Sequence, residues 1–445
     1  FIFSSLLVVT GLGDFIHAVA NYLLGNQKGG PAKIAVATSG LFGMMSGSPV
    51  ANVAAVGSFT IPLMKRIGYD SKTAASIEAI AASGGGLMPP VMGLGAFLMA
   101  EIVGVSYTTV CLWGIIPAFL WYWTLYWVVE HNAWAQDLKT WRPEWKETLE
   151  VIKEKWLLAL AVILLLVFLV KLQVAEVAAL WGVIGLILLS SIRKGTRLNL
   201  EKLCVFLEDF TKTFAPICIL ISLLGIFISS LMSTGAHIKL GLLIFGGLDN
   251  WFLITFIVSL LCVLFGMIVP IVAAYLAVAL IASPILINYG FPVSVTHMFV
   301  FYVCALAPIT PPVALAVFTA SSISGSDPMK TGWHACKMAL PLWFVPFILL
   351  KREIFFAMSN SISYVIFWGI LVSLGSYIFT LGSIGNFRGR ILNITEKSLL
   401  VLTGLAVLQP FNANISIFAA IAGVGIMLYL LISNKNMARK EGLTA

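Results

Sequence analysis

One segment of this 445-residue chain occurs twice, about half a chain length apart. The run Leu-Phe-Gly-Met at residues 41–44 returns at residues 264–267. The pair Pro89-Pro90 returns as Pro311-Pro312, which is 222 residues later. Both copies interrupt long apolar sequence with Gly, Pro and small polar residues. The sequence therefore predicts a fold made of two related halves that are broken at the same places.

Apolar runs of about 20 residues recur along the whole chain, and this is the length that a bilayer-spanning helix needs. Only 10% of the residues are charged, against about 25% in a typical soluble domain. The runs do not alternate polar and apolar residues as the strands of a membrane barrel do. We therefore predict an all-α polytopic membrane protein. Basic cytoplasmic loops account for the net charge of +8, so no nucleic-acid partner is expected.

The interruptions predict two re-entrant helical hairpins and two discontinuous helices. In the first copy we expect a hairpin over residues 33–65, broken at Gly47-Ser48-Pro49, and a broken helix over residues 73–102. The second copy predicts a hairpin over residues 252–287 and a broken helix over residues 294–322. Two short stretches are better suited to the membrane interface than to crossing it, namely residues 14–24 and 237–245.

The other apolar runs predict ordinary membrane spans, at residues 105–129, 156–172, 175–192, 213–232, 333–350, 354–381, 399–411 and 415–432. Residues 131–155 are polar and predict a surface loop or an interfacial helix. The chain thus divides into four parts. Residues 1–129 form the first repeat, and residues 130–212 form a connecting loop with scaffold helices. Residues 213–350 form the second repeat, and residues 351–445 form extra C-terminal helices. The first repeat lacks a counterpart of residues 214–227, so we expect an N-terminal truncation inside a helix.

Five predicted spans separate the two hairpins. They are the broken helix at residues 73–102 and the spans at residues 105–129, 156–172, 175–192 and 213–232. Because five is odd, the hairpins enter from opposite faces and the copies are inverted repeats. If the first hairpin opens to the cytoplasm, the basic clusters at residues 139–155 and 193–202 lie inside, as the positive-inside rule requires. The pair Lys351-Arg352 lies outside and goes against the rule. The predicted location is the cell inner membrane, crossed many times.

Doubled breaks of this kind are the best sequence pointer to the binding site of a transporter. A broken helix exposes N-terminal amides, which favour anions, and free carbonyls, which favour cations. Hydroxyl, amide and carbonyl oxygens suit a hard cation such as Na⁺. The first copy predicts a Na⁺ site made of Ser46, Gly47, Ser48, Asn52, Gly84, Gly85 and Gly86. The second copy predicts a weaker site made of Gly266, Met267, Val269, Thr310 and Pro311.

An anionic substrate would lie at the same breaks. No Arg is near any of them, so helix N-termini, hydroxyls and amides would have to bind it. The candidate substrate residues are Ser48, Asn52, Pro89, Pro90, Thr310 and Pro312. Glu78 lies seven residues before Gly85 and shares its helix face. A carboxylate within a membrane span is functional by default, so Glu78 is either a coupling residue or a structural hydrogen-bond acceptor.

The cysteines and histidines indicate no further chemistry. The six Cys and five His residues form no metal-type spacing and no pairing of a nucleophile with a base. We therefore predict that the chain is not an enzyme and needs no cofactor beyond Na⁺ as the coupling ion. A membrane-embedded enzyme or assembly subunit would instead require a catalytic constellation.

The residues at the breaks resemble those of a known family, the large membrane (permease) subunit of TRAP transporters, which are tripartite ATP-independent periplasmic transporters. Within that family the chain is similar to the TAXI-type branch with fused membrane domains. The runs that carry the resemblance are Ser46-Gly47-Ser48-Pro49-Val50-Ala51-Asn52-Val53, Met88-Pro89-Pro90-Val91-Met92-Gly93 and Ile309-Thr310-Pro311-Pro312-Val313-Ala314. The resemblance covers residues 1 to about 350.

The resemblance implies a Na⁺-coupled importer of small organic anions, such as dicarboxylates and amino or keto acids, that works by an elevator mechanism. It implies a periplasmic TAXI-type substrate-binding protein as partner and a small four-helix membrane domain upstream. The second hairpin departs from the family pattern, because Ile268, Ile271 and Val272 stand where one Gly and two Thr residues are expected. The alternative function is a binding-protein-independent Na⁺/dicarboxylate symporter, since similar paired hairpins serve such carriers.

Overall fold

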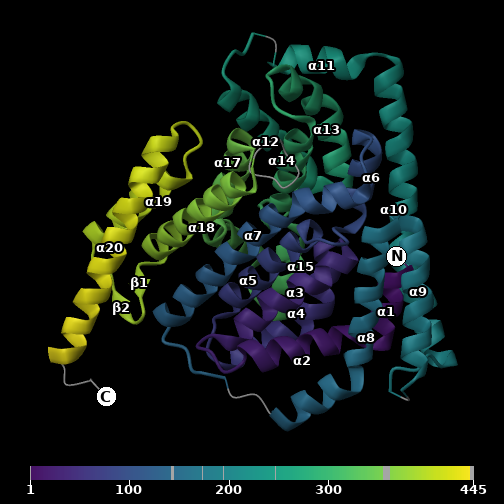
Figure 1. Ribbon diagram of the computed structural model, residues 1–445, viewed down its shortest axis with the longest axis horizontal. Helices are drawn as coiled ribbons and strands as arrows, with labels where there is room; N and C mark the ends of the chain where they lie inside the picture. The colour runs from purple at the N-terminus through teal and green to yellow at the C-terminus, as the bar shows by residue number, and fades with distance from the viewer. Residues whose placement is uncertain are drawn as a thin grey trace.

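The computed structural model describes residues 2–141, 145–172, 174–193, 195–245, 247–353 and 361–440. These residues are almost entirely helical (Figure 1). Among them, β structure is limited to a two-stranded antiparallel ribbon, β1 (Asn386–Phe387) and β2 (Arg390–Ile391), and one isolated bridge between Lys28 and Thr140. The prediction of an all-α membrane protein is confirmed in these residues.

Three groups of helices follow one another along the chain. The first copy contains α1 (Ile2–Thr10), α2 (Leu12–Leu24), α3 (Gly30–Ser46), α4 (Pro49–Arg66), α5 (Ser71–Gly84), the 3₁₀ turn η1 (Gly85–Leu87), α6 (Gly93–Val103) and α7 (Tyr107–Ala135). The connecting helices are α8 (Trp145–Leu172), α9 (Ala175–Ser191) and α10 (Leu200–Ser233), of which α10 also enters the second copy.

The second copy continues through α11 (Ala236–Phe245), α12 (Trp251–Ile268), α13 (Ile271–Asn288), α14 (Val293–Leu306), η2 (Ala307–Ile309), α15 (Leu315–Ser324), α16 (Pro328–Met338) and α17 (Leu340–Arg352). The C-terminal helices are α18 (Ile362–Ile384), α19 (Ile394–Leu408) and α20 (Ala413–Lys440). In the described part of the chain, six helices are long and apolar enough to cross a membrane, or seven if α16 and α17, which meet at 48°, form one bent span.

The two copies share their backbone geometry. The helices α4 and α13 begin 222 residues apart, at Pro49 and Ile271, and the two 3₁₀ turns have the same spacing. Met92 and Ala314, also 222 residues apart, are both left-handed, with φ of 48° and 40°. The bonds Pro89-Pro90 and Pro311-Pro312 are both cis. The repeated sequence therefore folds into repeated structure, down to single backbone conformations.

The copies lie at opposite ends of the molecule, but each packs the helix that follows its second break against the other copy. Figure 1 shows α2 along one end and α11 across the other. Helix α15 of the second copy packs on α4 and α5 of the first, whereas α6 of the first copy packs on α13 and α14 of the second. Helix α7 contacts both copies. The breaks of the two copies are thereby brought to the centre of the fold.

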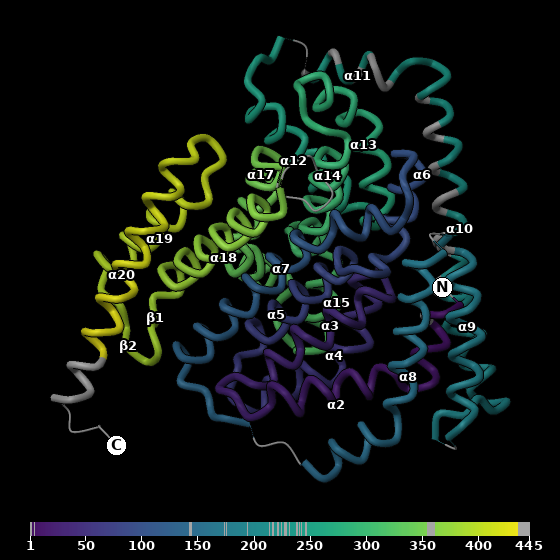
Figure 2. Tube along the Cα trace, in the orientation of Figure 1, coloured from purple at the N-terminus to yellow at the C-terminus, as the bar shows by residue number. Residues whose placement is uncertain are grey.

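The C-terminal helices α18, α19 and α20 extend from one side of this core (Figure 2). They attach through α7, where Trp123 Nε1 donates a hydrogen bond to Ser373 O at 3.1 Å. The rings of Trp127 and Tyr377 meet edge to face at 4.6 Å. A large aromatic contact thus joins the extra helices to the helix that touches both copies.

Several predicted boundaries differ from the structure. Residues 131–155 do not form one polar segment, because α7 continues to Ala135 and α8 begins at Trp145. The span expected at residues 213–232 is the second half of the 34-residue α10. A membrane span can continue into water as an ordinary helix, so hydropathy locates the span but not the helix ends. Of the span expected at residues 354–381, residues 354–360 lie outside the described part.

One largely buried ion pair joins α3 to α7 within the first copy. Lys33 Nζ of α3 lies 2.5 Å from Glu130 Oε2 of α7, and the Lys33 side chain is only 3% exposed. The pair Lys155–Asp14 joins α8 to α2 at the same distance, but the Asp14 side chain is 68% exposed. The two pairs therefore differ mainly in how much water surrounds them.

We expect Lys33→Met to lower the stability of the purified protein by about 3 kcal/mol, because it leaves the buried Glu130 Oε2 without its cationic partner. Lys155→Met, the matched control, should cost less than about 1 kcal/mol. Unfolding in detergent, followed by circular dichroism, measures both. The double variant Lys33→Met/Glu130→Gln should recover much of the loss. Equal effects of Lys33→Met and Lys155→Met would contradict this account of the pair.

Candidate functional site

The break between α3 and α4 depends on three consecutive residues. Gly47 ends α3 in a left-handed conformation, with φ of 62°, which glycine adopts without steric cost. The Ser48 side chain caps α4 by accepting a hydrogen bond from the Ala51 amide at 3.3 Å. Pro49 then occupies the first turn of α4, where its missing N–H is no loss. This local chemistry ends one helix and starts the next within two residues.

The break after α5 meets this tip through direct backbone contact. A Cβ at Gly85 would lie 2.5 Å from Gly43 Cα, and one at Gly47 would lie 2.8 Å from Gly93 Cα. Gly84 packs against Trp121 of α7, whose Nε1 donates to Ile80 O at 3.1 Å. The glycines predicted from the sequence therefore let the tip, η1 and the start of α6 approach one another.

Two side-chain oxygens at this junction are buried and have no partner. Asn52 is fully buried, and its Nδ2 donates to Ser39 O at 2.8 Å. Asn52 Oδ1 and Ser46 Oγ accept no hydrogen bond. A buried polar atom left unsatisfied costs about 1–3 kcal/mol. Buried side-chain oxygens without a partner suit a hard cation such as Na⁺, so the chemistry of these two donors fits the first predicted site.

Glu78 lies on α5 and contacts the middle of α3 and the middle of α4. Its side chain is fully buried on α5. Ser39 Oγ of α3 donates to one carboxylate oxygen. Thr60 Oγ1 of α4 lies 2.6 Å from the other. The structure thus places this predicted coupling residue between α3, α4 and α5.

The second copy brings its predicted residues together with different chemistry. A Cβ at Gly266 would lie 2.6 Å from Ala307 Cβ, so α12 touches η2 as α3 touches η1. Thr310 Oγ1 donates to Leu306 O at 2.8 Å. Within residues 266–270 and 307–312, all of which the structure describes, no buried side-chain oxygen is left without a partner. Any cation bound by Gly266, Met267, Val269, Thr310 and Pro311 would depend mainly on carbonyls.

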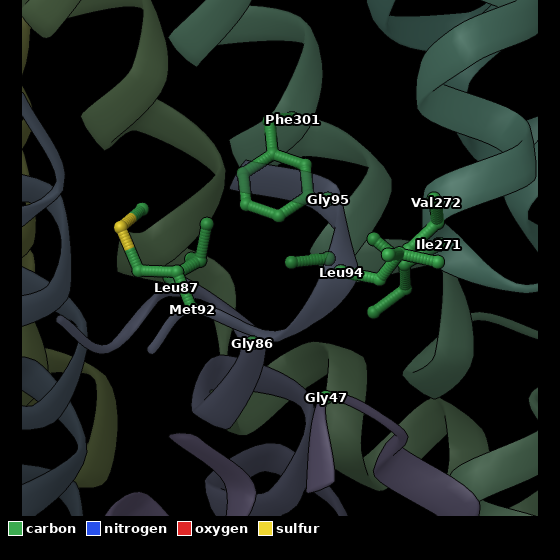
Figure 3. A pocket seen from close by; sticks show the side chains of 10 residues that line it. Gly47, Gly86, Leu87, Met92, Leu94, Gly95, Ile271, Val272 and Phe301 are labelled. Atoms are coloured by element: carbon green, nitrogen blue, oxygen red, sulfur yellow. The ribbon is translucent and has the colours of Figure 1, made fainter. Parts of the chain in front are cut away.

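A small apolar cavity lies between segments of the two copies (Figure 3). Its volume, measured as the space open to the centre of a water molecule, is about 10 Å³. The cavity is lined by Gly47, Gly86, Leu87, Met92, Leu94, Gly95, Ile271, Val272, Phe301 and Ala305. The first turns of α6 and α13 form part of its wall, and no side chain caps either helix. The amides that begin both helices therefore lie next to a space without charged side chains.

None of the six predicted substrate residues lines this cavity. Pro90 O instead accepts a hydrogen bond from Tyr107 Oη at 2.9 Å. The sequence did not indicate Leu94, and it indicated Ile271 and Val272 only as positions where expected Thr hydroxyls are missing. Each of them lies in the first turn of the helix that follows a break, and that position is the signal that would have found them.

Helices broken at the centre of a two-copy, multi-pass membrane fold, with uncapped helix N-termini beside a shared cavity, define the class of membrane transport proteins. The chain belongs to the family described as "Tripartite ATP-independent periplasmic transporter, DctM component", whose model matches residues 1–358. Family membership was therefore predicted correctly from the break motifs. The helices α18, α19 and α20 lie beyond the matched residues.

Curated relatives agree with this family. The chain is 28% identical over 346 residues to the "Isethionate TRAP transporter permease protein DctMQ" of Oleidesulfovibrio alaskensis, covering 75% of this chain and 52% of that protein. It is 32% identical over 169 residues to the "C4-dicarboxylate TRAP transporter large permease protein DctM" of Vibrio cholerae, 37% of each chain. The chain spans about half the length of the isethionate relative.

The contact between Gly43 and Gly85 can be tested by adding one methyl group. Gly85→Ala should lower stability by about 1–3 kcal/mol, because the new Cβ overlaps backbone atoms that must then move. Gly369→Ala is the matched control, since Gly369 lies within α18 and its Cβ would meet nothing within 4 Å. Alanine should leave that helix as stable or up to about 1 kcal/mol more stable. Wild-type stability of Gly85→Ala in detergent would show that the breaks do not pack this way.

Proposed function

We propose that this chain is the membrane subunit of a Na⁺-coupled secondary importer of small organic anions, fed by a periplasmic substrate-binding protein. The observation that carries the proposal is the pair of unpartnered buried oxygens, Asn52 Oδ1 and Ser46 Oγ, at the break of the first copy. Family membership supports it independently. In this proposal Na⁺ is the positively charged partner that these oxygens lack, and the Na⁺ gradient drives uptake.

The anion is proposed to bind between the copies, near the first turns of α6 and α13. Amides at a helix N-terminus point at the ligand and favour negative charge. Relatives of this chain are described as permeases for isethionate, C4-dicarboxylate and sialic acid, which are all organic acids. The cavity of this structure is too small for such a molecule, so substrate entry requires movement of the helices around it.

The proposed movement is of the elevator type. The re-entrant pairs α3–α4 and α12–α13 and the broken helices would travel together, while α8, α9 and α10 belong to the fixed scaffold. The exchange of α6 and α15 between the copies supports a single moving unit, because each copy holds part of the other. We further propose the TAXI-type branch, with a fused four-helix domain, in the cell inner membrane. The break motifs of both copies support this branch.

Reconstituted vesicles test the transport proposal. The full-length protein is placed in proteoliposomes and supplied with labelled isethionate, succinate, glutamate or 2-oxoglutarate, with or without a Na⁺ gradient and the binding protein. We expect uptake of one of these acids only when both are present. Strong uptake with Na⁺ alone, with no gain from the binding protein, would support the independent Na⁺/dicarboxylate symporter instead. Uptake indifferent to Na⁺ would contradict both functions.

Asn52 offers a sharper test of the cation site. Asn52→Ala removes one proposed Na⁺ ligand, and a loss of about 1.4 kcal/mol in binding raises the half-saturating Na⁺ concentration about tenfold. Ser58→Ala is the control on the same helix, because Ser58 is exposed and its Oγ donates only to Ala55 O, at 2.8 Å. Initial uptake rates against Na⁺ concentration measure both variants. An unchanged half-saturation in Asn52→Ala would exclude Asn52 as a ligand.

A further inference from the structure

Glu78 forms a buried polar junction that joins three helices. Both of its oxygens have a hydroxyl partner, Ser39 Oγ on α3 and Thr60 Oγ1 on α4. Gly57 of α4 makes room for its stem, since a Cβ there would lie 3.1 Å from Glu78 Cγ. Glu78 forms no ion pair among the described residues. The carboxylate therefore acts as a two-sided hydrogen-bond partner that holds α3 and α4 against α5.

The junction continues to the tip through a single residue. Ser39 contacts Glu78 with its hydroxyl and Asn52 with its backbone carbonyl. A carbonyl can only accept, so the Asn52 amide must turn its Nδ2 toward Ser39. That orientation leaves Asn52 Oδ1 buried and unpartnered. Ser39 therefore links the Glu78 carboxylate to the Asn52 amide, whose orientation the Ser39 carbonyl sets.

The second copy has none of these four groups. Val300, Ala282 and Ala274 lie 222 residues after Glu78, Thr60 and Asn52. Cys262 lies 223 residues after Ser39, the spacing that relates the Leu-Phe-Gly-Met runs. All four counterparts are buried in the same helical frame. The second copy forms the same helical frame with three apolar side chains and one thiol at these positions, so the frame alone does not require the junction.

We propose that Glu78 is a positioning residue for the cation site of the first copy. It touches neither the cation nor the substrate, and it acts through Ser39 to orient Asn52 Oδ1. This inference rests on the Na⁺ site of the proposed function. Residues that hydrogen-bond to the direct ligands of a metal fix the orientation of those ligands. Losing one such residue typically lowers the metal affinity about 10–100-fold. A residue that only stabilised the fold would not act selectively on Na⁺.

The test is Na⁺ activation of uptake by the full-length protein in proteoliposomes with its binding protein. Glu78→Leu should raise the half-saturating Na⁺ concentration about tenfold or more, while the rate at saturating Na⁺ stays near wild type. Glu78→Gln should restore part of the affinity, because the amide keeps one acceptor oxygen. Ser39→Ala, which removes one hydroxyl only, should shift the half-saturation in the same direction if Glu78→Leu does not fold. Ser83→Ala is the control, since Ser83 Oγ donates only to Ala79 O of its own helix, at 2.8 Å.

The outcomes separate the two proposals. If wild-type uptake does not respond to Na⁺, the proposed function fails before the variants are compared. If wild type responds and both Glu78→Leu and Ser39→Ala keep its half-saturation while losing maximal rate, Glu78 is not a positioning residue for the cation. If Glu78→Gln behaves like Glu78→Leu in every measurement, the hydrogen bonds of the carboxylate do not transmit the effect.

Discussion

The whole core depends on one constraint, which is that a helix broken inside a membrane must find new partners for its backbone. Lipid offers none, so irregular backbone survives at membrane depth only against protein or a water-filled cavity. Here the protein meets this need by close approach of two breaks, where Gly43 and Gly85 come into backbone contact. Any larger side chain at Gly85 would separate them. Glycine at both positions allows this contact, on which the candidate site depends.

The two copies use one backbone plan for different chemistry. Helix bounds, left-handed residues and cis prolines recur with the same spacing. The first copy keeps Ser48, Asn52 and a buried carboxylate around its break, whereas the second has Pro270, Ala274 and Val300 at the matching positions. A fold repeated in this way can give cation binding to one copy and leave the other with carbonyls and apolar side chains. The shared cavity, walled by segments of both copies, lies where these two halves meet.

Much of this arrangement could be predicted from the sequence, because breaks are local. Gly47, Ser48 and Pro49 carry their own turn and cap chemistry, and the structure ends α3 at Ser46 and starts α4 at Pro49. Family membership followed from the same motifs. Helix ends outside the membrane, such as that of α7 at Ala135, could not be predicted from hydropathy because polar residues continue a helix readily.

The partners of Glu78 could not be predicted either. Ser39 and Thr60 lie 39 and 18 residues away in sequence, and only the packing of α3, α4 and α5 brings them to the carboxylate. In the sequence, the cavity-lining Ile271 and Val272 stood out only because they replace expected Thr residues and so lack a hydroxyl. Their place in the wall depends on α6 of the first copy reaching α13 of the second, which no local pattern encodes.

The central claim is that the first copy binds Na⁺ through the unpartnered oxygens at its break. Equilibrium binding of radioactive Na⁺ to the purified protein, without substrate or binding protein, tests it most directly. The account predicts saturable binding by wild type that is strongly weakened in Asn52→Ala and intact in Ser58→Ala. Wild-type affinity in Asn52→Ala, or no saturable Na⁺ binding at all, would contradict it.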